Sequence, residues 1–151
     1  PARPVVVEAE ASKIGERMLP PALWTRLAQA PCIELLAERA ERARYLVSAY
    51  AELAADRAAL EAAIERLPVH PSRERLDHWR VLADAGAFAD LAEALLALHY
   101  DPAYDRAGKK SSRPLLGSLP VRPGDAGDMD RAAQAAARLT LARPGATLGA
   151  T

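Results

Sequence analysis

Apolar residues recur three and four positions apart along most of the chain, a spacing that places side chains on one face of a helix. Such a stripe indicates a helix with one face packed against a core. The sequence therefore predicts a mostly helical protein. The expected helices cover residues 20–30, 38–54, 57–67, 72–85 and 88–100, followed by a weak alanine-rich helix over 128–139.

Proline and capping residues set the expected helix ends. Asp56 and Ser72 have short polar side chains that accept hydrogen bonds from the free amides of a helix N-terminus. A glycine divides residues 72–100 into a helical hairpin. Asp101 is expected to end this hairpin, because the residue before a proline disfavours the helical conformation. Residues 102–127 are therefore expected to be mostly loop.

Short apolar runs between the helices predict strands. Three consecutive β-branched valines within residues 3–8 are typical of a strand that is apolar on both faces, as in a parallel sheet covered by helices. Residues 32–36 predict a second strand, which completes a parallel βαβ unit with the first. A short edge strand is expected within 115–121. The predicted fold class is α/β, mostly helical, with two or three strands and five or six helices.

Composition narrows the classes of function. The 20 basic and 20 acidic residues cancel, so bulk charge does not require a nucleic acid or a membrane as partner. The single cysteine, Cys32, excludes an internal disulfide and a CxxC metal site, and it suits a reducing cytoplasm. No apolar run approaches the roughly 20 residues that span a bilayer.

Two features concern the organisation of the chain. The sequence opens with a proline and runs directly into a buried type of strand, so we expect it to be a piece of a longer protein. Residues 1–127 are expected to form the body of one domain. Residues 128–151 are expected to add the weak helix and a disordered tail.

Two carboxylates, Glu8 and Glu10, follow the valines of the first predicted strand. They share a face if the strand continues that far, because strand side chains alternate. Ligands bind at the carboxyl ends of strands in open α/β sheets, and P-loop proteins place an acid there to hold Mg²⁺ or its water. Both glutamates are candidate catalytic residues, as ligands or as a base. The alternative, strand-end acids in solvent or bonded to loop amides, stays open.

Four stretches match the motifs of one family in the same order. Residues 7–15 read V-E-A-E-A-S-K-I-G, against a family pattern of V-E-x-E-S-x-K-I-G. In the family, the next helix begins with L-P and the next strand begins with P-C or P-x. Residues 19–20 and 31–32 of this chain match these two starts. The remaining matches are Glu41, Arg42, Leu46 and Tyr50 in E-R-x-x-x-L-x-x-x-Y, and residues 99–104 in H-Y-D-P-x-Y. On these motifs the chain resembles the bacterial tRNA 2-selenouridine synthases.

The resemblance implies a function for the parent protein. Family members replace sulfur by selenium at the 2-position of the wobble uridine of tRNA, with selenophosphate as co-substrate. They join a rhodanese-like domain, which has a catalytic cysteine, to a P-loop domain. Residues 4–106 resemble the C-terminal part of the second domain, so a partial P-loop NTPase-like sheet is implied. The implied partners are tRNA and the missing rhodanese and P-loop portions, with no membrane and no DNA.

The chain also departs from the family. It has no G-x-x-x-x-G-K-[ST] phosphate loop, and Cys32 lies on a predicted strand, so it is not the rhodanese nucleophile. We therefore expect no bound cofactor and no catalysis by this chain alone. Ala11 stands where the family has serine, and Ser12 is the neighbouring hydroxyl that would replace it in contacting phosphate.

Several cations are candidates for binding phosphate. Lys13 and Arg17 flank a glycine in the loop after the first strand, where phosphate or the tRNA backbone would lie; ordinary surface charge is the alternative. Arg39 and Arg42 lie one helical turn apart, so they share a face of the predicted helix. In nucleotide kinases, arginines on a helix over the phosphates stabilise charge in the transition state. Salt bridges with neighbouring glutamates are the alternative, favoured for Arg39 and left open for Arg42.

The last candidates concern RNA. In an RNA site, the rings of Tyr100 and Tyr104 would stack on an unpaired base, and Asp101 would hydrogen-bond a base edge. The alternative is a helix end that is packed by its tyrosines. The histidines lack the i, i+4 spacing of a zinc site, so no metal is expected. A basic stretch, either an RNA contact or a solvated loop, comprises Arg106, Lys109, Lys110 and Arg113.

Two other classes of function stay open. A helical protein-interaction module without catalysis predicts no affinity for RNA. A fragment of a P-loop small-molecule phosphotransferase predicts nucleotide binding without tRNA binding.

Overall fold

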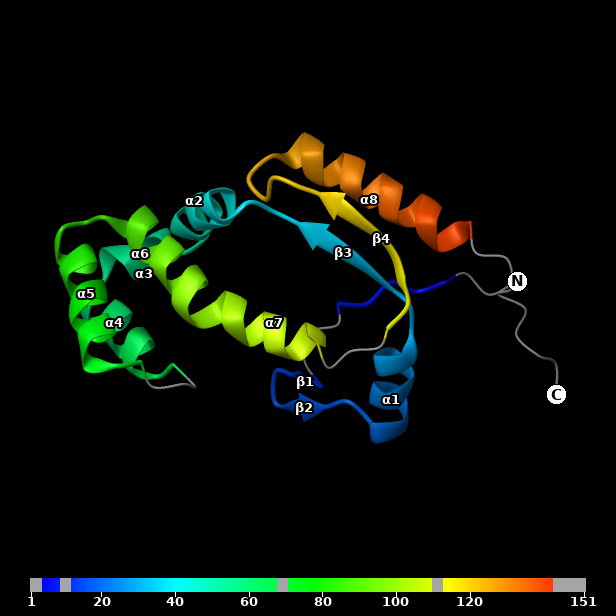
Figure 1. Cartoon of the computed structure of the whole chain (residues 1–151), viewed down its shortest axis with the longest axis horizontal. Helices are drawn as coiled ribbons and strands as arrows, with labels where there is room; N and C mark the ends of the chain where they lie inside the picture. The colour runs from blue at the N-terminus through cyan, green and yellow to red at the C-terminus, as the bar shows by residue number, and fades with distance from the viewer. Residues whose placement is uncertain (1–3, 9–11, 68–70, 110–112, 143–151) are drawn as a thin grey trace. The chain divides into compact units, whose positions relative to one another are not determined.

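The computed structural model describes residues 4–8, 12–67, 71–109 and 113–142. These residues are mostly helical and include a small parallel sheet, as the sequence predicted (Figure 1). The chain divides into two compact units. The sheet unit comprises residues 1–36, 111–121 and 127–151, and the helical unit comprises residues 37–110 and 122–126. No helix in the described ranges has the length and apolar character needed to cross a membrane.

The sheet unit contains the parallel pair β3 (Cys32–Leu36) and β4 (Leu115–Pro120). Both strands were predicted from their apolar runs. Ile33 lies opposite Gly117 in the register, and the pairing extends to a hydrogen bond from the Val121 amide to the Leu36 carbonyl at 2.7 Å. The half-buried Cys32 lies at the start of β3, as expected.

The prediction of a strand over residues 3–8 is wrong for the part that the structure describes. Residues 4–8 belong to no strand, and Val5, Val6 and Val7 are 84, 70 and 52% exposed. The expected βαβ unit is therefore absent from these residues, because β3 pairs with β4 instead. A β-branched sequence favours extended backbone, but a strand also needs a neighbouring strand to accept and donate its hydrogen bonds.

Two helices accompany this sheet. Helix α1 (Pro21–Gln29) begins at a proline and ends before Pro31, as the sequence predicted. Helix α8 (Ala126–Leu141) begins before Asp128, so it is longer than the predicted helix over 128–139. Leu139 of α8 packs on β4 so closely that a Cβ at Gly117 would lie 3.1 Å from its Cδ1 atom. Glycine at this position thus permits the close approach of helix and strand.

The helical unit begins with three helices: α2 (Arg39–Ala49), α3 (Ala51–Ala55) and α4 (Arg57–Glu65). A break at Tyr50 divides the single helix expected over 38–54. The Asp56 side chain accepts a hydrogen bond from the Ala59 amide at 2.9 Å, so the predicted N-cap is confirmed. Ser72 caps α5 (Arg73–Asp84) in the same way, through the amide of Arg75.

The remaining helices of this unit follow one another without a loop. They are α6 (Phe88–Leu95), the π-helical turn η1 (Leu96–Tyr100) and α7 (Asp101–Lys109). The expectations that Asp101 ends the hairpin and that 102–127 is mostly loop are therefore wrong over residues 101–109. A proline removes one backbone donor and crowds the carbonyl four residues before it. The π turn directly before Pro102 widens the helix, with the Asp101 amide bonding the Leu96 carbonyl, so the chain remains helical.

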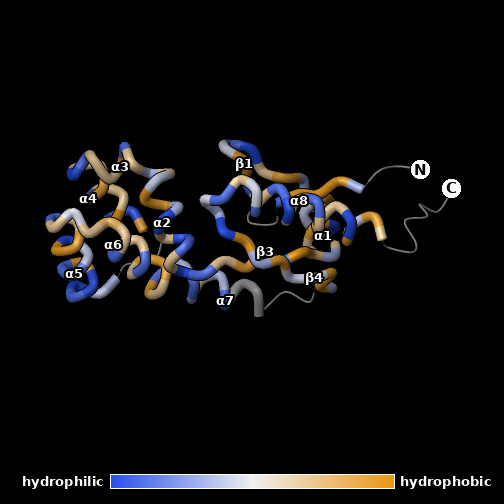
Figure 2. The backbone as a smooth tube through the Cα atoms, turned by 90° about the horizontal axis from the view of Figure 1, so that it is seen from above, coloured by the Kyte–Doolittle hydropathy of each residue, from blue (hydrophilic) through white to orange (hydrophobic). Residues whose placement is uncertain are grey.

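Trp79 is the centre of the core of the helical unit. It is fully buried, and it clusters with buried apolar residues of α4 and α6. Figure 2 shows apolar and polar residues alternating along these helices, as expected for helices with one buried face. The other buried members of this cluster are Leu60, Ile64, Leu67, Ala83 and Leu91.

Charged side chains join α4 to α5 at their surface. Arg80 donates to Glu61 at 2.6 Å, and Arg57 donates to Asp84 at 2.7 Å and to Glu61 at 2.9 Å. Hydrogen bonds from Arg80, then from Arg57, lower the pKa of Glu61. This network links the surfaces of two helices whose apolar faces meet in the core.

Candidate functional site

An ion pair between Arg42 and Asp101 lies among the candidate residues of the helical unit. The two terminal nitrogens of Arg42 donate to the two carboxylate oxygens of Asp101 at 2.8 and 2.9 Å. Arg39 donates to the same carboxylate through Nε at 3.1 Å. The side chains of Asp101 and Arg42 are only 20 and 33% exposed. Such a paired, partly desolvated geometry is stronger than an ordinary surface salt bridge.

Local structure explains this arrangement. Arg39 and Arg42 are three residues apart on α2, so both project from one face of the helix. Asp101 is the first residue of α7, and its position depends on the uninterrupted path through η1. Thus Arg42 pairs with a carboxylate 59 residues away rather than with its neighbouring glutamates.

The pair shifts the pKa of both groups. Hydrogen bonds from Arg42, and more weakly from Arg39, lower the pKa of Asp101 despite partial burial. The hydrogen bond to Asp101 raises the pKa of Arg42. Both groups stay charged at neutral pH, and each uses its hydrogen-bonding capacity mainly on the other. The carboxylate of Asp101 therefore accepts hydrogen bonds from arginine. The sequence had offered a hydrogen bond to a base edge as one role for this carboxylate.

The lowered pKa of Asp101 predicts lower stability in acid. A carboxyl group with a depressed folded pKa contributes stability above its unfolded pKa, about 3.9, and this contribution is lost as the pH falls through the folded value. We expect the free energy of unfolding to decrease below about pH 4 and to decrease less in Asp101→Asn, which cannot titrate there. Denaturant unfolding at neutral and acidic pH tests this. Equal acid sensitivity in both proteins would contradict it.

Tyrosines from two parts of the chain line one apolar pocket of the helical unit. Tyr50 follows α2, Tyr100 ends η1 and Tyr104 lies on α7. All three contribute to the wall of the pocket, together with Leu46. The ring of Tyr100 also meets the His99 ring edge to face, with centroids 5.1 Å apart. The tyrosines are thus brought together by the fold, as they would be in a site that contacts aromatic or apolar groups.

The candidate residues of the sheet unit are not brought together as Arg42 and Asp101 are in the helical unit. Lys13 lies on β1 (Lys13–Ile14) and Arg17 on β2 (Arg17–Met18), an antiparallel hairpin that replaces part of the expected loop over 9–19. Lys13 pairs with Met18 in the register, and Arg17 pairs with Ile14. Lys13 and Arg17 therefore point to opposite faces and do not converge on one phosphate.

Other features of the hairpin are consistent with a surface turn. Gly15 has φ +57°, a conformation that glycine adopts without strain. Lys13 forms an exposed ion pair with Glu16 at 3.6 Å. The Ser12 side chain is half-buried, while its carbonyl accepts a hydrogen bond from the Leu19 amide at 2.8 Å. The backbone of residue 12 therefore helps to close the turn.

The remaining candidates are placed only in part. Glu8 is exposed and outside any strand, whereas Glu10 lies outside the described residues, so their shared face stays a prediction. Arg106 and Lys109 belong to α7, where a loop was expected, and Lys110 lies outside the described residues. Arg113 donates to the Ala28 carbonyl at 3.3 Å. Arg113 thus links two segments of the sheet unit.

Sequence reasoning missed the pairing of Arg42 with Asp101 and the network around Glu61. The sequence did contain local signals for the residues involved: two arginines share one face of a predicted helix, and an aspartate precedes a proline. No local pattern shows which distant carboxylate meets which arginine. In the ranges that the structure describes, no three His, Cys, Asp or Glu side chains lie close enough to hold a metal ion.

The chain was compared with protein-family models, with curated proteins and with solved structures. None of these comparisons finds a match.

Proposed function

We propose that the chain is the C-terminal part of the P-loop domain of a tRNA 2-selenouridine synthase. The parent enzyme would exchange sulfur for selenium at the 2-position of the wobble uridine, with selenophosphate as donor, in the cytoplasm. The proposal rests on the four motifs that resemble this family. The structural observation that supports it most is the contact between Arg42 and Asp101.

This contact joins two of the four motifs. Arg42 belongs to the E-R-x-x-x-L-x-x-x-Y match and Asp101 to the H-Y-D-P-x-Y match. Tyr50 from the first motif and Tyr104 from the second line the same pocket. Motif residues that meet in space form one structural feature, and this favours a shared family pattern over separate chance matches.

The contact also changes the roles that we propose. Arg42 and Asp101 hold α2 and α7 together, so they position the neighbouring tyrosines rather than contact substrate. Tyr100 and Tyr104 remain candidates for stacking on a base. The cations of α7 and Lys13 remain candidates for binding RNA phosphates. In the complete enzyme Glu8 and Glu10 would act near the phosphates, while this chain alone would bind tRNA without catalysing the exchange.

The proposal predicts salt-dependent binding of tRNA by this chain. Three phosphate contacts would weaken binding about 20-fold for a threefold rise in salt. We expect a variant with Arg106, Lys109 and Lys110 changed to alanine to bind about tenfold more weakly at low salt and to show a shallower salt dependence. Arg113 is left unchanged because it bonds the Ala28 carbonyl. Fluorescence anisotropy with labelled tRNA measures both quantities.

A matched control removes the same charge elsewhere. Arg26, Arg73 and Arg75 are exposed, and their replacement by alanine also removes three cations. An equal loss in both variants would mean that binding follows net charge only. No binding at low salt by a folded chain would contradict tRNA contact by this part of the protein. Binding of ATP without tRNA would instead favour a phosphotransferase fragment, and binding of neither would favour an interaction module.

A further inference from the structure

The helical unit contains an apolar pocket of about 490 Å³. Its wall includes Leu60, Ile64, Leu91 and Leu96, which are all buried residues of the unit. A hollow that reaches core side chains is deeper than a flat docking surface. Its volume lies within the range of about 300–1,000 Å³ that is usual for small-molecule sites.

The chemistry of the wall restricts what the pocket can hold. Every lining residue is aliphatic or aromatic, and only the tyrosines have a polar side-chain group. A charged ligand would find no counter-charge there and would lose its hydration without compensation. Water fills such a hollow poorly, because an ordered water needs two to four polar partners. The favoured occupant is therefore uncharged and largely apolar.

The tyrosines of the wall carry its polar side-chain groups and are exposed to solvent. Tyr50 and Tyr100 are 58 and 42% exposed, so their rings line the wall while they also reach solvent. Tyr100 ends the π turn η1, and Leu96 at its start also lines the pocket. Single π turns within helices are rare and concentrate at functional sites. The widened turn thus shapes this wall in addition to accommodating Pro102.

We infer that this pocket is a binding site for a small, uncharged, largely apolar molecule, with solvent-exposed tyrosines in its wall. The inference is argued from the pocket and goes beyond the proposed function, although the pocket shares Tyr100 and Tyr104 with the proposed base-stacking site. An apolar ligand would pack against the lining side chains and remove their apolar surface from water.

Binding of the neutral dye N-phenyl-1-naphthylamine to the full chain tests the inference. We expect saturable binding of one dye per chain, seen as increased dye fluorescence. Ala92 lines the pocket from α6, and Ala92→Phe should fill it and weaken dye binding at least tenfold. Ala89 is exposed on the same helix, and Ala89→Phe should bind dye as the unchanged chain does.

Nuclear magnetic resonance of the unchanged chain provides a measurement that needs no variant. Dye binding should shift amide signals of Leu60, Leu91 and Leu96 before those of the sheet unit. The absence of saturable binding would overturn the inference. So would equal binding by folded Ala92→Phe and Ala89→Phe, or signal shifts confined to the sheet unit.

Discussion

Replacement of Trp79 by alanine is expected to destabilise the helical unit by about 3–5 kcal/mol, the usual cost of removing a buried aromatic side chain. Trp79 is the largest fully buried side chain of the described residues and contacts the core residues of α4 and α6. Small domains have only about 5–15 kcal/mol of stability in total. We therefore expect Trp79→Ala to be largely unfolded under mild denaturing conditions, as measured by far-ultraviolet circular dichroism in urea.

Two further variants make this prediction specific. The indole nitrogen of Trp79 is buried without a hydrogen-bond partner among the described residues, so Trp79→Phe removes an unsatisfied donor and should cost less than Trp79→Ala. Val81 is 64% exposed on the same helix, and Val81→Ala should change stability by less than about 0.5 kcal/mol. Similar losses for Trp79→Ala and Val81→Ala would mean that α5 does not pack as described.

Replacement of Asp101 by alanine is expected to destabilise the helical unit by about 2 kcal/mol, because hydrogen bonds to charged groups contribute about 1.5–3 kcal/mol. The substitution leaves Arg42 and Arg39 side by side without their shared carboxylate. Thermal or urea unfolding measures the loss. In a double-mutant cycle with Arg42→Ala, the two substitutions should couple by about 1–2 kcal/mol, since either one breaks the same pair.

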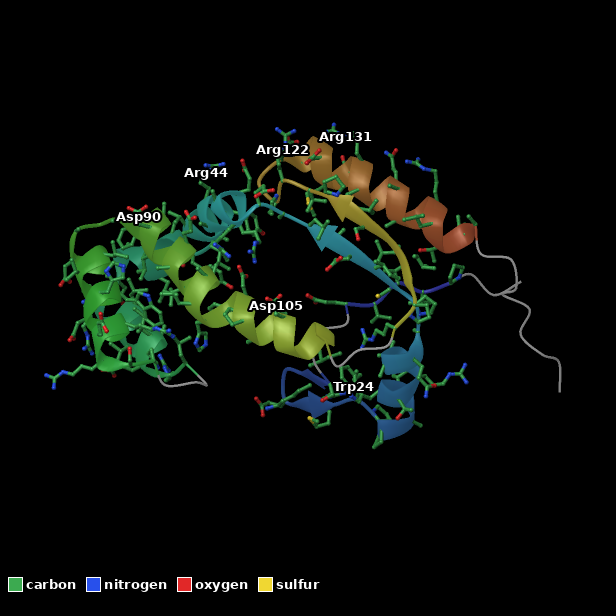
Figure 3. The ribbon with its side chains drawn as sticks, in the orientation of Figure 1. Trp24, Arg44, Asp90, Asp105, Arg122 and Arg131 are labelled. Atoms are coloured by element: carbon green, nitrogen blue, oxygen red, sulfur yellow. The ribbon has the colours of Figure 1, made fainter. Side chains whose placement is uncertain are left out.

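The Glu41–Arg44 pair on α2 is the matched control. These residues are one turn apart, and Figure 3 shows Arg44 projecting from α2 on the side away from α7. An exposed pair of this kind contributes little, so Glu41→Ala should change stability by less than about 0.5 kcal/mol. If Asp101→Ala left stability unchanged but abolished tRNA binding, Asp101 would contact RNA directly and the positioning role would be wrong.

The local signals of the sequence predicted much of the secondary structure. Asp56 and Ser72 cap their helices because a cap depends only on a side chain and the amides of the next turn. The run over residues 32–36 forms β3, and the run near 115–121 forms β4. The caps are decided by interactions within a few residues of one another, and the two strands were indicated by their local apolar runs.

The tertiary structure decided the pairings. Residues 4–8 have the composition of a buried strand, yet β3 pairs with β4, more than 80 positions along the chain. Asp101 precedes a proline, yet the π turn before it lets the helix continue to Lys109. Arg42 has glutamates beside it in sequence but pairs with Asp101. Local sequence determined most of the helices and the two strands of the parallel sheet. Partners distant in sequence, and the elements that depend on them, are decided by the path of the whole chain, which no local pattern encodes.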